Sequence, residues 1–202
     1  MADLTFGNRE IRDFRNKLTG GGARSNLFEV DIAYPTGLGA DATGSAVNDG
    51  QFLIKAAEIP AANLGNIPVP FRGRVLPVAG DRTFDPWTVT IINDTNFVIR
   101  NAMEQWSNFI NDIQTNQGEI NPAAYQTSAT VKQLSRKGKD EGKIDVLRTY
   151  KFEGIYPNAV SSIPLDYGAT DQIEEFQVTF NYLFWEVADS KPAMTAKAQT
   201  TT

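Results

Sequence analysis

Residues 175–184, EFQVTFNYLF, alternate polar and apolar side chains as far as Tyr182 and place Phe184 at the next apolar position. The apolar members are Phe176, Val178, Phe180, Tyr182 and Phe184, and the polar members between them include Glu175, Gln177, Thr179 and Asn181. Because successive side chains along a strand point to opposite faces, this period of two predicts a strand with one buried face and one solvent-exposed face.

Four other segments repeat the alternation more briefly, at residues 28–34, 52–55, 87–91 and 150–156. Each predicts a further half-buried strand, with Phe52 and Ile54 as the apolar members of the second segment. Several short strands separated by turn-forming residues are typical of antiparallel sandwiches and barrels. We therefore expect a mainly β fold of this kind.

One segment has a helical period. Its apolar side chains recur every three or four residues, at Val98, Ala102, Met103, Trp106, Phe109, Ile110 and Ile113. This spacing predicts one amphipathic helix of about four turns that lies against a sheet. Asp94 or Thr95 can cap its first turn.

The 202 residues are enough for one domain with flexible ends. We expect an N-terminal arm at residues 1–25, a β domain at 26–188 and a flexible C-terminal tail at 189–202. Residues 35–50 and 114–130 are predicted to be long connections. No apolar run is long enough to cross a bilayer and no signal-peptide core is visible, so the chain is expected to stay in the cytosol or to leave without the usual export route.

Composition argues against catalysis. The chain has no cysteine and no histidine, which removes thiolate nucleophiles, the commonest general base and the commonest transition-metal ligand. The carboxylates that could be paired, such as Asp81 and Asp85, lack the usual acid–base partners. We expect a protein that is not an enzyme, with no catalytic residues, no cofactor and no metal site.

The net charge argues against a nucleic-acid-binding surface. The formal net charge is −5, from 19 basic and 24 acidic residues, whereas neutralising DNA phosphates needs a cationic surface. The basic residues between Lys132 and Lys143 have no aromatic residues among them for base stacking, and they are predicted to form a solvated hairpin turn. The glycines at 37, 39 and 44 lack the lysine of a phosphate loop and are predicted to form a flexible loop.

The segment VPFRGRVLP, residues 69–77, predicts a projecting or edge hairpin. Prolines remove backbone donors and keep a segment out of the middle of a sheet, while Gly73 suits a tight bend. The flanking arginines suit bidentate pairing with carboxylates at an interface. The residues predicted to form a subunit interface are Phe71, Arg72, Gly73, Arg74, Asp81 and Arg82.

Several short motifs occur in order along the chain. They are AEIP, RGR, GDRTF and PWTVT, at residues 57–60, 72–74, 80–84 and 86–90, and the later run from YKFEGIYPN to YLFWEV within residues 150–187. Together they resemble the tail tube proteins of contractile-tailed bacteriophages. The resemblance spans roughly residues 25–187. It implies a phage tail tube fold of two packed antiparallel sheets with one helix, shared with the tubes of type VI secretion systems.

The resemblance also implies a function. Family members form hexameric rings that stack into a hollow tube within a contractile sheath, and strands of the subunits close an inner barrel. The implied partners are further copies of the chain and the sheath, tape-measure, baseplate and tail terminator proteins. The tape-measure protein and then genomic DNA pass through the lumen without specific binding. The implied location is the virion tail, after assembly in the host cytoplasm.

Two hypotheses follow from this resemblance. Residues 1–25, the hairpin from Phe71 to Val78, and the loop 37–50 are expected to be ordered mainly by neighbouring subunits. The wall of the lumen is expected to be neutral or acidic, since DNA must slide without sticking, and its candidate residues are Glu175, Gln177, Thr179 and Asn181. The alternative is a tube or adaptor subunit of a phage-like injection or secretion particle with protein cargo.

Overall fold

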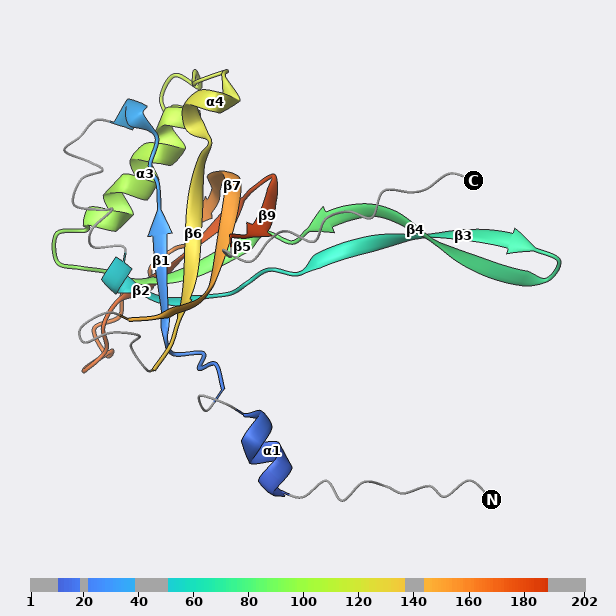
Figure 1. Cartoon of the computed structure of the whole chain (residues 1–202). Helices are drawn as coiled ribbons and strands as arrows, with labels where there is room; N and C mark the ends of the chain where they lie inside the picture. Colours follow the sequence, from blue (N-terminus) through green and yellow to red (C-terminus); the bar gives the residue numbers. More distant parts are fainter. Residues whose placement is uncertain (1–10, 19–21, 39–50, 137–143, 189–202) are drawn as a thin grey trace, which may run out of the picture.

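The computed structural model describes residues 11–18, 22–38, 51–136 and 144–188. Its strands are β1 (Phe28–Ile32), β2 (Ile54–Ala57), β3 (Ala62–Phe71), β4 (Arg74–Phe84), β5 (Trp87–Ile92), β6 (Thr127–Leu134), β7 (Val146–Val160), β8 (Glu175–Asn181) and β9 (Phe184–Val187). Its helical segments are α1 (Ile11–Lys17), the short 3-10 helix η2 (Thr36–Leu38), α3 (Val98–Ile110) and α4 (Pro122–Tyr125). Figure 1 shows their arrangement.

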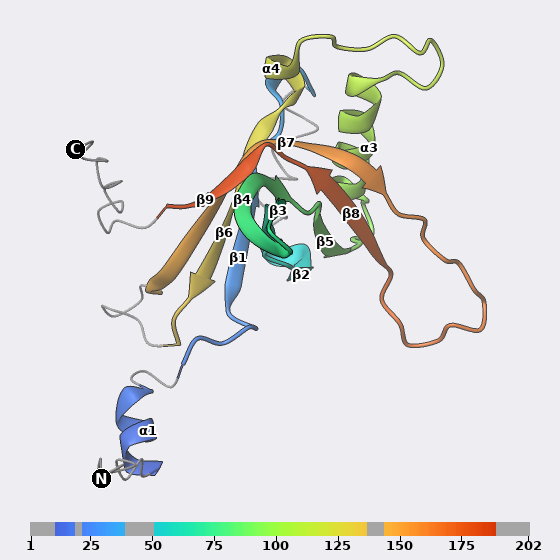
Figure 2. The same cartoon turned by 90° about the vertical axis from the view of Figure 1, so that its right-hand side faces the viewer.

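Two antiparallel sheets share the long strand β7. The strand order is β1-β6-β7-β8-β5-β2, and β9 also pairs with β7. The first part of β7 pairs with β6 and β9, whereas its last part, from Tyr156, pairs with β8. Gly154 lies two residues before the change of partner, at a register shift against β6, and has a φ of 67°, in the left-handed region that favours glycine. Figure 2 shows the two halves of β7 running in different directions, so this strand carries the chain from one sheet to the other.

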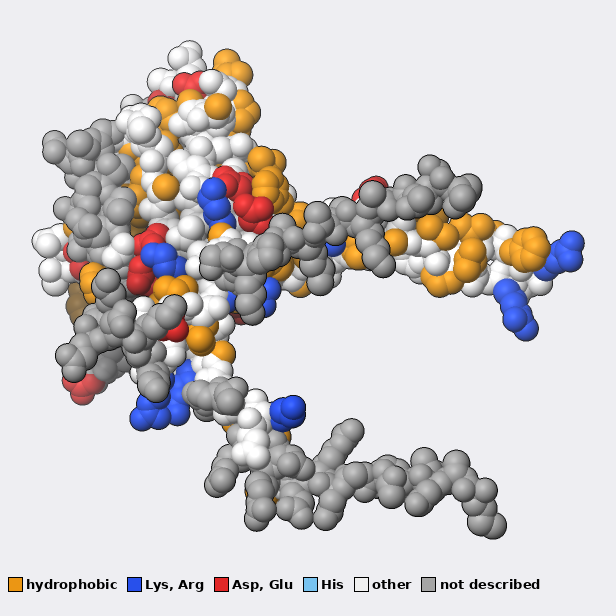
Figure 3. All heavy atoms as spheres, in the orientation of Figure 1, with side chains coloured by type: hydrophobic (Ala, Val, Ile, Leu, Met, Phe, Trp, Pro, Cys, Tyr) orange, Lys and Arg blue, Asp and Glu red, His pale blue; other side chains and the backbone are white. Residues whose placement is uncertain are grey.

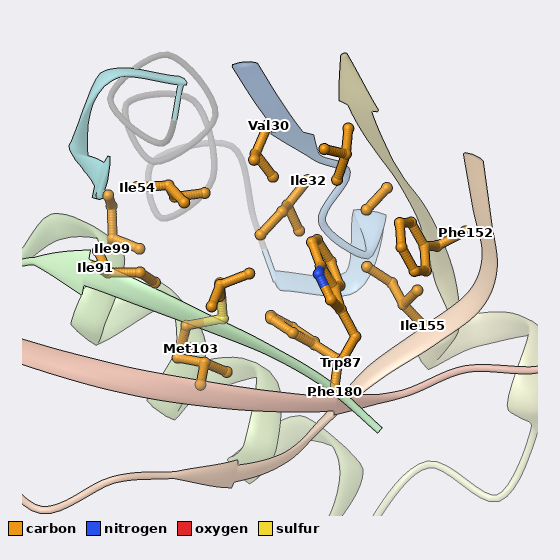
Figure 4. Close-up of a cluster of buried hydrophobic side chains, with 14 of the residues drawn as sticks. Val30, Ile32, Ile54, Trp87, Ile91, Ile99, Met103, Phe152, Ile155 and Phe180 are labelled. Atoms are coloured by element: carbon orange, nitrogen blue, oxygen red, sulfur yellow. The ribbon is translucent and has the colours of Figure 1, made fainter. Parts of the chain in front are cut away.

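The core lies between the two sheets and α3. Trp87 and Phe152 stack at its centre, with ring centroids 4.5 Å apart, and both side chains are fully buried. Figure 4 shows the side chains that converge there from the sheets and the helix. The buried set includes Val30, Ile32, Val89, Ile91, Ile99, Met103, Trp106, Ile155, Phe176, Val178 and Phe180. Each fully buried large apolar side chain contributes about 1.5–3 kcal/mol.

Strand predictions that rest on alternation are largely confirmed. Every second residue of β5 is buried, and Phe176, Val178 and Phe180 of β8 are buried as expected. The prediction for Phe52 is wrong, because residues 51–53 form a helical turn that leaves its side chain 84% exposed. The predicted strand 175–184 also ends early, at Asn181, and Phe184 begins β9 with a partly exposed side chain.

The helix prediction is confirmed, with a shorter C-terminal end. The N-cap residue is Phe97, which has no side-chain cap, and not Asp94 or Thr95 as predicted. Asp94 nevertheless accepts hydrogen bonds from the backbone N–H groups of Asn96 (3.1 Å) and Val98 (3.0 Å), and so satisfies the first N–H of α3. Helix α3 ends at Ile110, and Ile113 lies beyond it, 89% exposed. Within the described residues, no helix is long and apolar enough to cross a membrane.

The predicted connection 114–130 is shorter than expected. Its end forms α4 and the first residues of β6. The Asn121 side chain accepts from the Ala123 N–H, and Pro122 occupies the first turn, where its missing N–H costs nothing. Residues 39–50, 137–143 and 189–202, which include most of the predicted long loop, the basic turn and the C-terminal tail, lie outside the described residues.

Candidate assembly interface

Strands β3 and β4 form a hairpin that projects from the body of the molecule (Figure 1). Among the described residues they pair only with each other, from Ala62↔Phe84 to Phe71↔Arg74. Arg72 and Gly73 make the two-residue turn with φ values of 44° and 80°, as in the hairpin turns whose twist matches that of the strands. Ten residues of extended strand correspond to a length of about 33 Å. The projecting hairpin predicted around Gly73 is therefore confirmed.

Large apolar side chains on this hairpin face solvent. Phe71 is 67% exposed, and the others with substantial exposure are Leu64, Ile67, Val69, Val75, Leu76 and Val78. Figure 3 shows them along the length of the hairpin, with basic side chains at its tip. Exposed apolar patches of this kind mark interaction surfaces, and an isolated two-stranded hairpin is only marginally stable in water. The hairpin therefore has the surface of a binding element.

The six residues predicted to form an interface do not make one cluster. Phe71, Arg72, Gly73 and Arg74 lie together at the tip, and the Arg72 guanidinium carbon lies 5.3 Å from the centroid of the Phe71 ring. Asp81 and Arg82 lie near the base, beside a register shift between Leu64 and Asn66. In the part of the chain that the structure describes, none of these charged side chains forms an ion pair.

The sequence reasoning missed the apolar character of the hairpin. The interface prediction rested mainly on the arginines, although Ile67, Val69 and Phe71 occupy every second position and so share one face of the strand. The prolines at 68 and 70 occupy the intervening positions, so the segment lacks the polar partners that mark a half-buried strand.

Contacts at the base attach the hairpin to the sheets. The Tyr182 hydroxyl donates to the backbone oxygen of Asp85 at 2.7 Å, and the Asn63 side-chain amide donates to the Asp85 carboxylate at 3.2 Å. The Phe84 ring lies against Tyr182 and Trp185, with centroids 5.9 and 6.5 Å away. Burial, with a smaller contribution from the Asp85 charge, raises the pKa of Tyr182 to about 12. These contacts fix the direction in which the hairpin leaves the body.

The four candidate lumen residues share the polar face of β8, opposite the core. The Thr179 hydroxyl lies 3.2 Å from that of Thr88, the Asn181 amide donates to the Tyr156 hydroxyl at 3.3 Å, and Glu175 pairs with Lys55 at 2.6 Å. The face therefore extends from β2 across β5 and β8 to the end of β7, with polar groups from each strand. Lys55 was not among the predicted lining residues, and Glu175 neutralises its charge.

This four-stranded layer has two open edges. Strand β2 pairs with β5 on one side, and Tyr156–Val160 of β7 pairs with β8 on one side. Among the described residues, no strand pairs with the other side of either segment. Unpaired edges present free N–H and C=O groups that can bind a strand of another molecule.

Lys132, the first residue of the predicted basic turn, lies instead within β6. Its ammonium group pairs with Glu29 at 2.9 Å and with Asp31 at 2.5 Å. Hydrogen bonds to Asp31 and Glu29 raise the pKa of Lys132 above its ordinary value. The side chain thus forms part of a cross-strand ion pair between β1 and β6.

Comparison with known proteins gives a consistent match. The family model described as "Phage tail tube protein" matches residues 23–188. The tail tube protein gp19 of Enterobacteria phage T4 is 38% identical over 168 residues, covering 81% of this chain and 91% of the relative. A tail tube protein of Serratia phage KSP90 is 30% identical over 181 residues, covering 89% of this chain and 97% of the relative.

Solved structures show the same fold at lower identity. The sheath/tube terminator structure of the extracellular contractile injection system PVC matches with a TM-score of 0.58 and 15% identity, covering 83% of this chain and 97% of that one. The tube-terminating cap of the anti-feeding prophage matches with a TM-score of 0.57 and 18% identity, covering 82% and 90%.

Proposed function

Because this chain belongs to the phage tail tube protein family, we propose that its copies close into hexameric rings that stack into the inner tube of a contractile phage tail. The protein is a structural component of the virion. The observation that carries the assembly proposal is the hairpin β3–β4, which exposes a strip of large apolar side chains outside the core that the described residues form. A subunit within a tube covers such a surface with its neighbours.

Ring closure uses the two open edges of the four-stranded layer. If β2 of one copy pairs with Tyr156–Val160 of the next, the layer continues around the ring and no edge remains exposed. The contact is head-to-tail, because the two edges differ in sequence and lie at opposite ends of the layer. Its polar face then lines the lumen and its apolar face stays against the core.

The lumen in this arrangement is polar and close to neutral. Gln177, Thr179 and Asn181 carry no charge, and Glu175 neutralises Lys55. Such a wall lets the tape-measure protein and then DNA move through without the phosphate contacts that would hold the DNA in place. Gln177→Arg on every subunit should slow genome ejection while leaving tube length unchanged, whereas Gln177→Ser should change neither. Unaltered ejection by the arginine variant would contradict this role of the face.

The remaining partners are those of a tail tube. The sheath surrounds the tube, the baseplate and tail terminator proteins bind its two ends, and assembly takes place in the host cytoplasm. A particle with protein cargo is the less favoured function, since the relatives of 30–38% identity are phage tail tube proteins and the injection-system chains share only 15–18%.

Electron microscopy of the purified protein tests the proposal. Smooth tubes with six-fold end views are expected, together with rings at low concentration. A monodisperse monomer at high concentration, or tubes of another symmetry, would contradict it.

A further inference from the structure

The loop between β7 and β8 forms a second exposed apolar surface. Its side chains Leu165, Tyr167 and Ile173 are 87%, 109% and 71% exposed. They line an open hollow of about 830 Å³. The loop lies at the lower left of the body in Figure 1, whereas the hairpin β3–β4 extends to the right. In Figure 2 the hairpin points toward the viewer and the loop projects to the side, so the two apolar surfaces lie on separate parts of one subunit.

The hollow is acidic. Asp166, Glu174 and Glu175 line it, and no lysine or arginine is among its lining residues. Glu175 is paired with Lys55 and Glu174 accepts from the Asn93 amide. The Asp166 carboxylate accepts only from the backbone N–H of Gly168 within its own loop, and no cation faces it in the described residues.

The hairpin tip has the complementary chemistry. It presents the exposed Phe71 ring beside the Arg72 guanidinium and opposite Arg74 in the strand register, and neither guanidinium has a carboxylate partner among the described residues. An arginine pairs well with a carboxylate in a bidentate contact, and an aromatic ring beside it supplies apolar area. The tip therefore offers an apolar anchor with two cations, and the hollow offers apolar walls with an unpaired carboxylate.

We infer that the hairpin tip of one subunit binds the β7–β8 loop hollow of a second copy in the adjacent ring. This inference rests on the proposed function and names the two surfaces that join one ring to the next. Phe71 supplies the apolar contact to Leu165 and Tyr167, and Arg74 pairs with Asp166. Because the two surfaces differ and occupy separate parts of the subunit, each copy can bind one neighbour and be bound by another, which gives an open stack instead of a closed dimer.

The absence of cysteine allows a direct cross-linking test. Val75→Cys beside the tip, combined with Ala169→Cys in the hollow, should give a ladder of disulfide-linked oligomers when assembled tubes are oxidised. The matched control is Val75→Cys with Gln114→Cys, which places the second thiol in the exposed loop after α3. A ladder in the control alone, or dimers from Val75→Cys by itself, would show that the tip binds elsewhere and overturn the inference.

A charge exchange provides the second test. Arg74→Glu and Asp166→Arg should each reduce the amount of sedimentable tube at least tenfold, and the double variant should recover most of it. Arg136→Glu serves as a control for loss of one surface cation. A double variant no better than either single one overturns the pairing. Wild-type protein that forms no tubes contradicts the proposed function, whereas failure of the cross-link in protein that does form tubes contradicts only the tip-to-hollow contact.

Discussion

Tyr182 donates a hydrogen bond to the backbone oxygen of Asp85 at 2.7 Å, and this contact joins the turn between β8 and β9 to the base of the projecting hairpin. The two residues are far apart in sequence, so the direction of the hairpin depends on the folded sheets. A rigid base matters for assembly because small changes in angle there move the distant tip by many ångströms.

Removing the hydroxyl should weaken this attachment. Tyr182→Phe should lower the free energy of unfolding by about 1 kcal/mol, since it removes one hydrogen bond while keeping the ring against Phe84. Urea denaturation of the unassembled subunit measures the change. Tyr167→Phe is the matched control, because its side chain is fully exposed and should leave stability unchanged. Equal stability of the two variants would show that the Tyr182 hydroxyl contributes nothing.

Ionisation of the same hydroxyl should make stability depend on alkaline pH. The pKa of Tyr182 is about 12 in the folded chain against an ordinary value of 10.0. The folded state therefore holds this proton more tightly than the unfolded state does. The contribution of the protonated hydroxyl to the free energy of unfolding is complete below pH 10 and is lost as the pH rises to about 12. Burial also raises the pKa of Tyr34, so titration of phenolate absorbance should show more than one late-ionising group, and Tyr182→Phe should remove one of them. A titration unchanged by that substitution would contradict the assignment.

The centre of the core should be sensitive to truncation. Trp87→Ala should cost about 3–5 kcal/mol, because it removes a fully buried ring that stacks on Phe152. Trp87→Phe should cost less, since the indole N–H of Trp87 has no hydrogen-bond partner among the described residues. Denaturation midpoints of the two variants provide the comparison. Similar losses for both would mean that the shape of the indole, and not its apolar area, dominates.

The apolar strip of the hairpin should matter for assembly and not for folding. Val69 and Leu76 face each other across β3 and β4, and both are exposed. Val69→Ser with Leu76→Ser should abolish sedimentable tubes while changing the melting temperature of the subunit by no more than a few degrees. The control, Ile120→Ser, removes an exposed apolar side chain from the loop between α3 and α4. Normal tubes from the double variant would remove the strip from the list of assembly contacts.

Much of this protein follows from local patterns in its sequence. The alternation of apolar and polar residues located β1, β5 and β8. Apolar residues at every second position identify the buried face of a strand wherever that strand lies in the fold. The three-to-four spacing located α3 for the same reason, and Asp94 marked the approximate position of its start. The proline and glycine positions around Gly73 predicted a projecting hairpin, because they exclude a central strand whatever the rest of the fold is.

Tertiary structure decided how these elements combine. The alternating pattern does not predict that β7 passes from one sheet to the other close to Gly154. That change of sheet depends on the strands that pair with β7, which are β6, β8 and β9. The alternating pattern also wrongly predicted a buried strand position for Phe52, which lies in the helical turn before the short strand β2. Only the folded chain leaves the strip of β3–β4 uncovered and places Asp166, which has no cation partner among the described residues, on a separate part of the surface. Burial depends on which surfaces meet and not on any single segment.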